Sequence, residues 1–211
     1  MTEPASERVA LAPTREVRRW MVATQAVFFA ALVVCVLIDA SYTAQNDGMS
    51  FYGVYGPTIA LVVVGYGTAS VGLWRVGQWF ARHGGPAILF LGARVVAVGL
   101  ILLLVTPYDE GTFLNWSHMT VGVAVALTQL ASTIALLRRA ATSRHVLIFS
   151  LQLAGGVVAA ASLPDWHFPM LLAGESVYAL GYALSLYAWV DVVAPLGHRR
   201  LRSRDDVDQG A

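Results

Sequence analysis

Six long apolar stretches, separated by short polar segments, divide the chain. About 20 apolar residues in a helix cross the hydrocarbon core of a bilayer, and each stretch has that length. The pattern therefore predicts an all-α integral membrane protein, a bundle of six transmembrane helices. The predicted spans are residues 20–38, 55–73, 86–105, 117–137, 145–163 and 170–194.

The polar segments define the rest of the organisation. We expect residues 1–17 to form a partly disordered N-terminal tail, 18–195 the six-span domain and 196–211 a C-terminal tail that is basic and then acidic. Pro57 is expected in the first turn of the second span, where proline is tolerated, and Pro195 is expected to end the sixth. The first span is too long for the apolar region of a signal peptide, so we expect it to be retained.

Composition supports the membrane class. The chain of 211 residues is 57% hydrophobic and only 13% charged, whereas about a quarter of the residues of a soluble domain are charged. All 14 basic residues are arginine, which excludes mechanisms that need a lysine, such as a Schiff base. Cys35 is the single cysteine, so an intramolecular disulfide is impossible and a packing role is expected.

Arginine is confined to alternate segments. The two ends of the chain and the loops at 75–85 and 138–144 hold 13 of the arginines, whereas 39–53, 106–116 and 164–169 hold none. The positive-inside rule then predicts that both termini are cytoplasmic in a multi-pass protein of the cell membrane. An odd number of spans would break this alternation.

Two kinds of residue fit the predicted helix boundaries and interfaces. Five tryptophans lie near span ends, as in an aromatic belt: Trp20, Trp74, Trp116, Trp166 and Trp189. Small residues in the second, third and fifth spans predict close helix packing: Gly65, Ala69, Gly72, Gly92, Gly99, Gly155, Gly156 and Ala159.

Two ionisable residues lie inside predicted spans. Arg94 is about 12 Å from the cytoplasmic edge of the third span, and Glu175 about 9 Å from the outer edge of the sixth. Charges at such depths face protein or water. We expect Arg94 and Glu175 to form a buried pair or to share a polar cavity, which leaves open a structural ion pair and a ligand or proton site.

Polar side chains also form a stripe on each of two spans, because the spacing of the residues matches a helical repeat. On the sixth span the stripe is Glu175, Tyr178, Tyr182, Ser185 and Trp189. On the fourth it is His118, Gly122, Val125, Gln129 and Ser132. The stripes predict either a polar cavity inside the bundle or hydrogen bonds between helices.

Histidine and carboxylates converge on the predicted outer side. The cluster comprises Asp39, Asp109, Glu110, His118, Asp165 and His167. Zinc binding and general acid–base chemistry both use these residue types, but no pair has metal-ligand spacing, so we expect no metal and can assign no cofactor. An acidic loop that caps the fourth helix, with His118 hydrogen-bonded at the interface, is the alternative.

Part of the chain resembles a known group. Pro107-Tyr108-Asp109-Glu110 followed by His118, together with Gly174-Glu175-Ser176 in the last span, resembles the six-helix DUF998 and Frag1/DRAM membrane proteins. Where that pattern commonly has an arginine after the glutamate, this chain has Ser176. The resemblance implies a six-helix bundle and candidate roles for Asp109, His118 and Glu175. Some eukaryotic relatives act in lipid remodelling or membrane trafficking.

Three functions remain open from the sequence. The first is binding of a lipid or small amphiphile in an outward-facing polar cavity, by a non-catalytic protein or an accessory subunit. The second is an intramembrane enzyme acting on lipids through His118, Asp109 and Glu175. The third is a transporter or substrate-capture subunit using Arg94 and Glu175. The expected partners are membrane lipids and another membrane protein or a second copy, and not nucleic acid. The candidate ligand-binding residues are Asp109, His118, Glu175, Arg94, Tyr178, Tyr182 and Gln129.

Overall fold

The computed structural model describes residues 5–108, 110–162 and 168–208, and their side chains between residues 14 and 194. Throughout these ranges the secondary structure is helical, with no strand. The helices are α1 (Ala5–Ile38), α2 (Tyr42–Asp47), α3 (Met49–Val54), α4 (Ile59–Arg82), α5 (Ala87–Val105), α6 (Thr112–Arg139), α7 (Ser143–Ala161) and α8 (Leu171–Asp208).

Six helices in the described ranges are long and apolar enough to cross a membrane, which confirms the predicted six-span bundle. Their spanning segments are Thr14–Ile38, Ile59–Arg82, Ala87–Val105, Thr112–Arg139, Ser143–Ala161 and Leu171–Ala194. The protein is therefore a multi-pass membrane protein, as its apolar runs indicate.

Several boundaries differ from the prediction. Helix α1 begins at Ala5, so the expected disordered tail is helical over most of its length. Helix α8 continues past Pro195, which was expected to end the sixth span. A proline removes one backbone donor but does not always end a helix. Pro57 precedes α4, whose N-cap is Thr58. Arg75, expected in a loop, lies inside α4.

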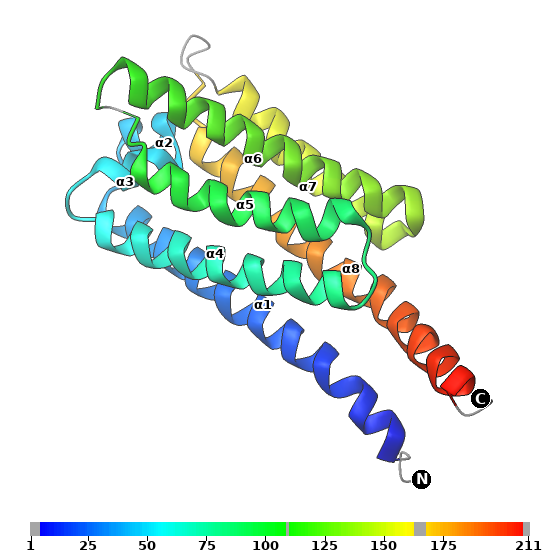
Figure 1. Cartoon of the computed structure of the whole chain (residues 1–211). Coiled ribbons are helices and arrows are strands. Elements are labelled where there is room, and N and C mark those ends of the chain that lie inside the picture. The colour runs from blue at the N-terminus through cyan, green and yellow to red at the C-terminus, as the bar shows by residue number, and fades with distance from the viewer. Residues whose placement is uncertain (1–4, 109, 163–167, 209–211) are drawn as a thin grey trace.

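Sequence neighbours lie side by side through most of the bundle (Figure 1). Helix α4 packs against α1 and α5, and α5 packs against α6. Helix α8 packs most extensively against α7 and also contacts α1, α6 and the short helix α2. The two termini lie at one end of the bundle, and α2 and α3 lie at the other (Figure 1).

Small residues allow the closest helix contacts. A Cβ atom added at Gly174 of α8 would lie 2.4 Å from the backbone nitrogen of Ala159 on α7. One added at Gly72 of α4 would lie 2.2 Å from Thr24 Oγ1 on α1. Hydrophobic attraction between helices is weak in lipid, so such close approach is a main source of helix association. The small residues predicted to mediate packing therefore occupy helix interfaces.

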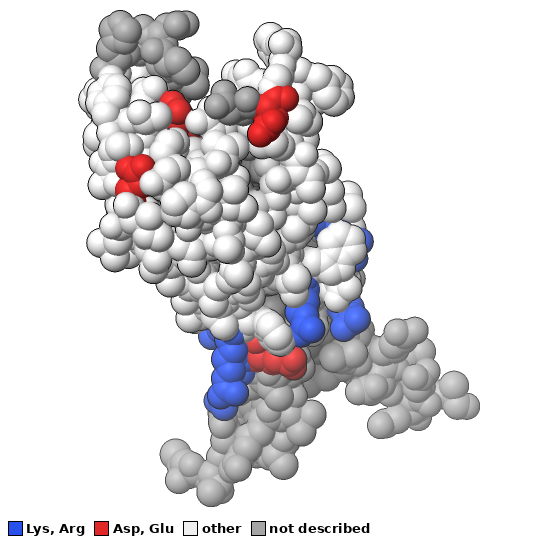
Figure 2. All heavy atoms as spheres, turned by 90° about the vertical axis from the view of Figure 1, so that its left-hand side faces the viewer, with Lys and Arg blue, Asp and Glu red and all other residues white. Residues whose placement is uncertain are grey.

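Charged side chains separate along the bundle axis (Figure 2). We call the end that carries α2 and α3 the acidic end; its described carboxylates include Asp39, Asp47 and Glu110. We call the opposite end, where α4 and α6 finish in arginines, the arginine end. One carboxylate, Asp191 of α8, lies among the arginines and forms ion pairs with Arg18 of α1 and Arg144 of α7.

The predicted belt tryptophans that the structure describes divide into two groups, and Trp166 lies outside the described residues. Trp20, Trp74 and Trp116 are exposed, which fits the predicted aromatic belt. Trp189 is completely buried, and its indole Nε1 donates a hydrogen bond to the Ser132 carbonyl at 3.1 Å. Its place in the belt was therefore predicted wrongly. The side chain joins α8 to α6 because it lies on the packed face of α8.

Candidate functional site at the acidic end

The predicted loop between the first two spans contains two short helices, α2 and α3, which we call the cap (residues Tyr42–Val54). Ser41 begins α2 by accepting a hydrogen bond from the Ala44 amide at 3.2 Å, as N-cap serines do. Gly48 ends α2 and precedes α3, with φ of 71°. Glycine adopts this conformation without strain, so Gly48 sets the angle between the two helices.

Two tyrosines attach the cap to the surrounding structure. The Tyr52 hydroxyl donates to the Asp39 carbonyl at the end of α1, at 2.7 Å. Burial, with the nearby Asp39 and Cys35, raises the pKa of the Tyr52 phenol, so it stays a neutral donor. The Tyr108 hydroxyl donates to Asp47 Oδ2 at 2.9 Å and links the cap to the α5–α6 loop.

Glu175 attaches the cap to α8. Its Oε2 accepts a hydrogen bond from the Met49 amide, the first residue of α3, at 2.7 Å. A carboxylate is a strong acceptor for the unpaired amides at the start of a helix. Any Cβ at Gly48 would lie 2.4 Å from the same oxygen. Gly48 and Glu175 therefore form one fitted contact between the cap and α8.

His118 of α6 connects the cap to a second span. Its Nδ1 lies 2.6 Å from the Thr106 carbonyl and its Nε2 lies 2.7 Å from Ser50 Oγ on α3. A carbonyl only accepts hydrogen bonds, so Nδ1 carries the proton and donates to it. In the neutral imidazole, Nε2 is then the acceptor, and the Ser50 hydroxyl donates to it.

A cavity of about 20 Å³ lies beside this pair. Residues of α3, α4, the end of α5 and the start of α6 line it, including Ser50, Tyr66 and His118, and its other lining residues are mainly apolar. The volume accommodates roughly one water-sized group. The Tyr66 hydroxyl makes no hydrogen bond to a described residue, whereas Ser50 and His118 hydrogen-bond to each other.

The structure does not join Arg94 to Glu175, contrary to the expected pair. The Arg94 guanidinium lies 5.3 Å from the ring centroid of Trp74 and 6.0 Å from that of Phe90. In the described ranges the ion pairs are those of Asp191, and Glu175 bonds to Met49 instead. Aromatic rings can stabilise a cation without a carboxylate, a possibility that depth along the helices does not reveal.

Residues of the two predicted polar stripes make different contacts and do not share one cavity. The Tyr178 hydroxyl donates to the Ala126 carbonyl of α6 at 2.5 Å, whereas the buried Tyr182 hydroxyl has no partner in the described part of the chain. Gln129 is buried in α6. None of these three residues lines the cavity beside His118. Of the predicted site residues that the structure describes, two contact the cap. His118 bonds to Ser50, and Glu175 bonds to the Met49 amide.

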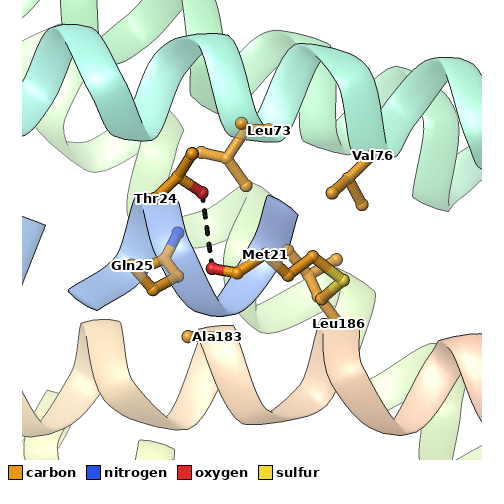
Figure 3. A pocket seen from close by; sticks show the side chains of 8 residues that line it. Met21, Thr24, Gln25, Leu73, Val76, Ala183 and Leu186 are labelled. Atoms are coloured by element: carbon orange, nitrogen blue, oxygen red, sulfur yellow. Dashed lines mark hydrogen bonds between the residues drawn. The ribbon is translucent and has the colours of Figure 1, made fainter. Parts of the chain in front are cut away.

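Other predicted features are not brought into this site. Asp109, Asp165 and His167 lie outside the described residues. Within the ranges that are described, no three histidine, cysteine or carboxylate residues are grouped so as to hold a metal. A second cavity, of about 10 Å³, lies between α1, α4 and α8 (Figure 3). The hydroxyl of Thr24, which lines it, already donates to carbonyls of its own helix. We therefore interpret this cavity as a gap in helix packing.

Sequence reasoning missed Ser50 and Tyr66. Ser50 lay in a segment interpreted as a polar loop, and Tyr66 was one more aromatic residue in an apolar span. The signal that was present is Ser41, an N-cap type of residue before Tyr42, which favours a helix in that segment. The contact between Ser50 and His118 joins residues 68 positions apart, and no local pattern encodes it.

No family model, no curated protein and no solved structure matches the chain. The resemblance to DUF998 and Frag1/DRAM proteins therefore stays a prediction.

Proposed function

We propose that this multi-pass protein binds a lipid or small amphiphile at its acidic end, beneath the cap. In this proposal the acidic end faces the outside of the cell membrane and both termini are cytoplasmic, because arginine gathers at the other end. The proposal also draws on the resemblance to DUF998 and Frag1/DRAM proteins, because some of those proteins act in lipid remodelling.

The observation that carries the proposal is the composition of the cavity. Three side chains with hydrogen-bonding groups, Ser50, Tyr66 and His118, line a small space that is otherwise mainly apolar. Ligand sites combine an apolar lining with a few polar groups that fix orientation. The Tyr66 hydroxyl is not engaged by a described residue, so it is free to donate to a ligand oxygen.

The size of the cavity limits what enters it. About 20 Å³ accommodates one water-sized polar group and not a whole headgroup. A carbonyl or hydroxyl oxygen of an amphiphile meets this limit, with its apolar chains lying along the helices outside. A larger headgroup would need the cap to move away from α6 and α8.

The depth of the cavity supports a lipid as the ligand. His118 lies 20 residues before Arg138 on α6, which is about 30 Å along the helix axis. That distance equals the thickness of the hydrocarbon core. With Arg138 at the cytoplasmic boundary, His118 lies at the outer boundary, where the ester groups of glycerolipids are found.

Native mass spectrometry of the purified protein, combined with lipid identification, tests the proposal. Gly53 lines the cavity, and a Cβ there would meet only Val62 Cγ1, at 4.0 Å, so Gly53→Leu should fill the space without displacing backbone. Gly67→Leu is the control, because Gly67 does not line this cavity and a Cβ there meets nothing within 4 Å.

We expect the wild type and Gly67→Leu to retain one class of amphiphile and Gly53→Leu to lose it, with all three proteins keeping a similar melting temperature. Equal retention by the two variants, or no selective retention by the wild type, would contradict the proposal.

A further inference from the structure

Ser50 and His118 have the geometry of a nucleophile and its base. The hydroxyl donates to Nε2 over 2.7 Å, and the opposite ring nitrogen is fixed by the Thr106 carbonyl at 2.6 Å. Serine nucleophiles are activated in this way, by a histidine that a third group orients. In this chain a backbone carbonyl occupies the place that a carboxylate takes in many such sites.

The surroundings of the pair suit a reaction at a carbonyl group. Both side chains line the cavity, so a water-sized oxygen inside it would lie near Ser50 Oγ. Tyr66 also lines this cavity, and its hydroxyl has no hydrogen-bond partner among the described residues. A tyrosine hydroxyl is one of the donors that stabilise an oxyanion.

The position of Ser50 is also fixed from two sides. The preceding residue, Met49, is attached to Glu175 of α8 through its amide, and Ser50 itself is bonded to α6. Catalytic groups need such support from neighbouring elements, because small displacements reduce rates strongly. Glu175 is thus a positioning residue in this arrangement, and it does not touch the cavity.

We propose that Ser50 is the nucleophile of an ester-cleaving site, with His118 as its base, Tyr66 as the oxyanion donor, and carboxylic esters of membrane lipids as the substrate class. This inference rests on the proposed function, since the ester is the amphiphile that the cavity binds.

The reaction has two balanced halves. Ser50 Oγ bonds to the ester carbonyl carbon while its proton passes to His118 Nε2. The bond from that carbon to the leaving alcohol oxygen then breaks, and the alcohol takes the proton from Nε2. Water repeats the sequence on the acyl-serine, with His118 accepting and returning a proton, and releases a carboxylic acid and free Ser50.

Covalent labelling by an alkyl fluorophosphonate tests the inference in the full-length protein in lipid nanodiscs. The probe forms a bond from phosphorus to Ser50 Oγ and loses fluoride, and peptide mass spectrometry locates the adduct. Ser117 is an internal control, because its hydroxyl donates to the Phe113 carbonyl of its own helix. The variants are His118→Gln, which retains hydrogen-bonding atoms but is a poor base, and Tyr66→Phe, which removes only the hydroxyl.

We expect the wild type to be labelled at Ser50 and not at Ser117. His118→Gln should label at least about 100-fold more slowly, the usual contribution of a general base. Tyr66→Phe should lose a similar factor if its hydroxyl holds the oxyanion, and it serves as the test if His118→Gln does not fold. An unlabelled Ser50 in folded wild type, or undiminished labelling in the folded variants, would overturn the inference.

Amphiphile retention by the wild-type protein, measured beside its labelling, separates the two proposals. Retention without labelling of the wild type refutes the reaction and leaves binding intact. Loss of selective retention in the wild type refutes both.

Discussion

Gly48 is the residue on which the attachment of the cap depends most directly. Its φ of 71° and its contact with Glu175 are separate demands on the same position. A side chain there would be strained in its backbone and would displace the carboxylate from the Met49 amide. The first cost is of order 1–3 kcal/mol, and the loss of a charge-assisted hydrogen bond adds a comparable amount.

Gly48→Ala should therefore destabilise the protein more than Gly111→Ala does. Gly111 also has positive φ, of 102°, but a Cβ there meets nothing within 4 Å, so it isolates the backbone term. We expect the difference in unfolding free energy between the variants to exceed about 1 kcal/mol. Chemical unfolding in detergent measures it, and equal losses would show that Glu175 does not constrain Gly48.

Arg94 and Glu175 should behave independently. The Arg94 guanidinium lies near the rings of Trp74 and Phe90, whereas the Glu175 carboxylate bonds to the cap. Residues without shared partners have additive effects, within about 0.5 kcal/mol. We expect the losses of Arg94→Leu and Glu175→Leu to sum in the double variant. A coupling energy above about 1 kcal/mol would contradict this expectation and support the ion pair predicted from sequence.

Among the elements, the pairing of α7 and α8 has the closest backbone contacts. A Cβ at Gly155, Gly174 or Gly181 would collide with backbone or Cβ atoms of the facing helix. These helices cannot separate slightly without losing contacts along their length, since packing attractions fall steeply with distance.

Gly174→Ala should accordingly lower stability by about 1–3 kcal/mol, the usual cost of overpacking. Gly122→Ala is the matched control, because Gly122 also lies within a spanning helix and a Cβ there meets nothing within 4 Å. Alanine has the higher helix propensity, so the control should be neutral or slightly stabilising. If both variants lose the same amount, close packing of α7 on α8 is not the cause.

The long elements were predictable and the short ones were not. Hydropathy locates the spans because 20 or so apolar residues have no other stable environment. Helices α2 and α3 have six residues each, too few for a periodic pattern. Their form depends on Gly48 and on contacts with Glu175 and His118, which are distant in sequence.

The candidate site was predictable only in part, for the same reason. His118 and Glu175 stood out because polar residues within spans need partners. The identity of those partners, Ser50 and Met49, depends on how the cap folds back over the bundle. Arg94 shows the opposite error, because it lies beside aromatic rings and not beside the carboxylate that the depth argument assigned to it.

At the scale of the whole molecule, charge separation predicts the topology. Thr112 and Arg139 lie at opposite ends of α6 and are both exposed. In a Cys35→Ala background, Thr112→Cys should react with an impermeant thiol reagent from outside intact cells, and Arg139→Cys only after permeabilisation. Cys35 is completely buried, but alanine differs from it only by the sulfur atom, so the change removes the thiol at a modest packing cost. Reaction of position 139 in intact cells would show that the topology is the opposite of the predicted one.

The central claim is that the cavity beneath the cap selects an amphiphile from the membrane. A photoreactive aliphatic amino acid close to valine in size, placed at Val54 so that the cavity stays open, tests it most directly when compared with one at Val123, which is exposed on the surface of α6. After irradiation in native membranes, mass spectrometry identifies the lipid adducts at each position. We predict that one amphiphile class dominates at Val54, whereas Val123 captures the bulk lipid mixture. The same mixture at both positions would contradict the account.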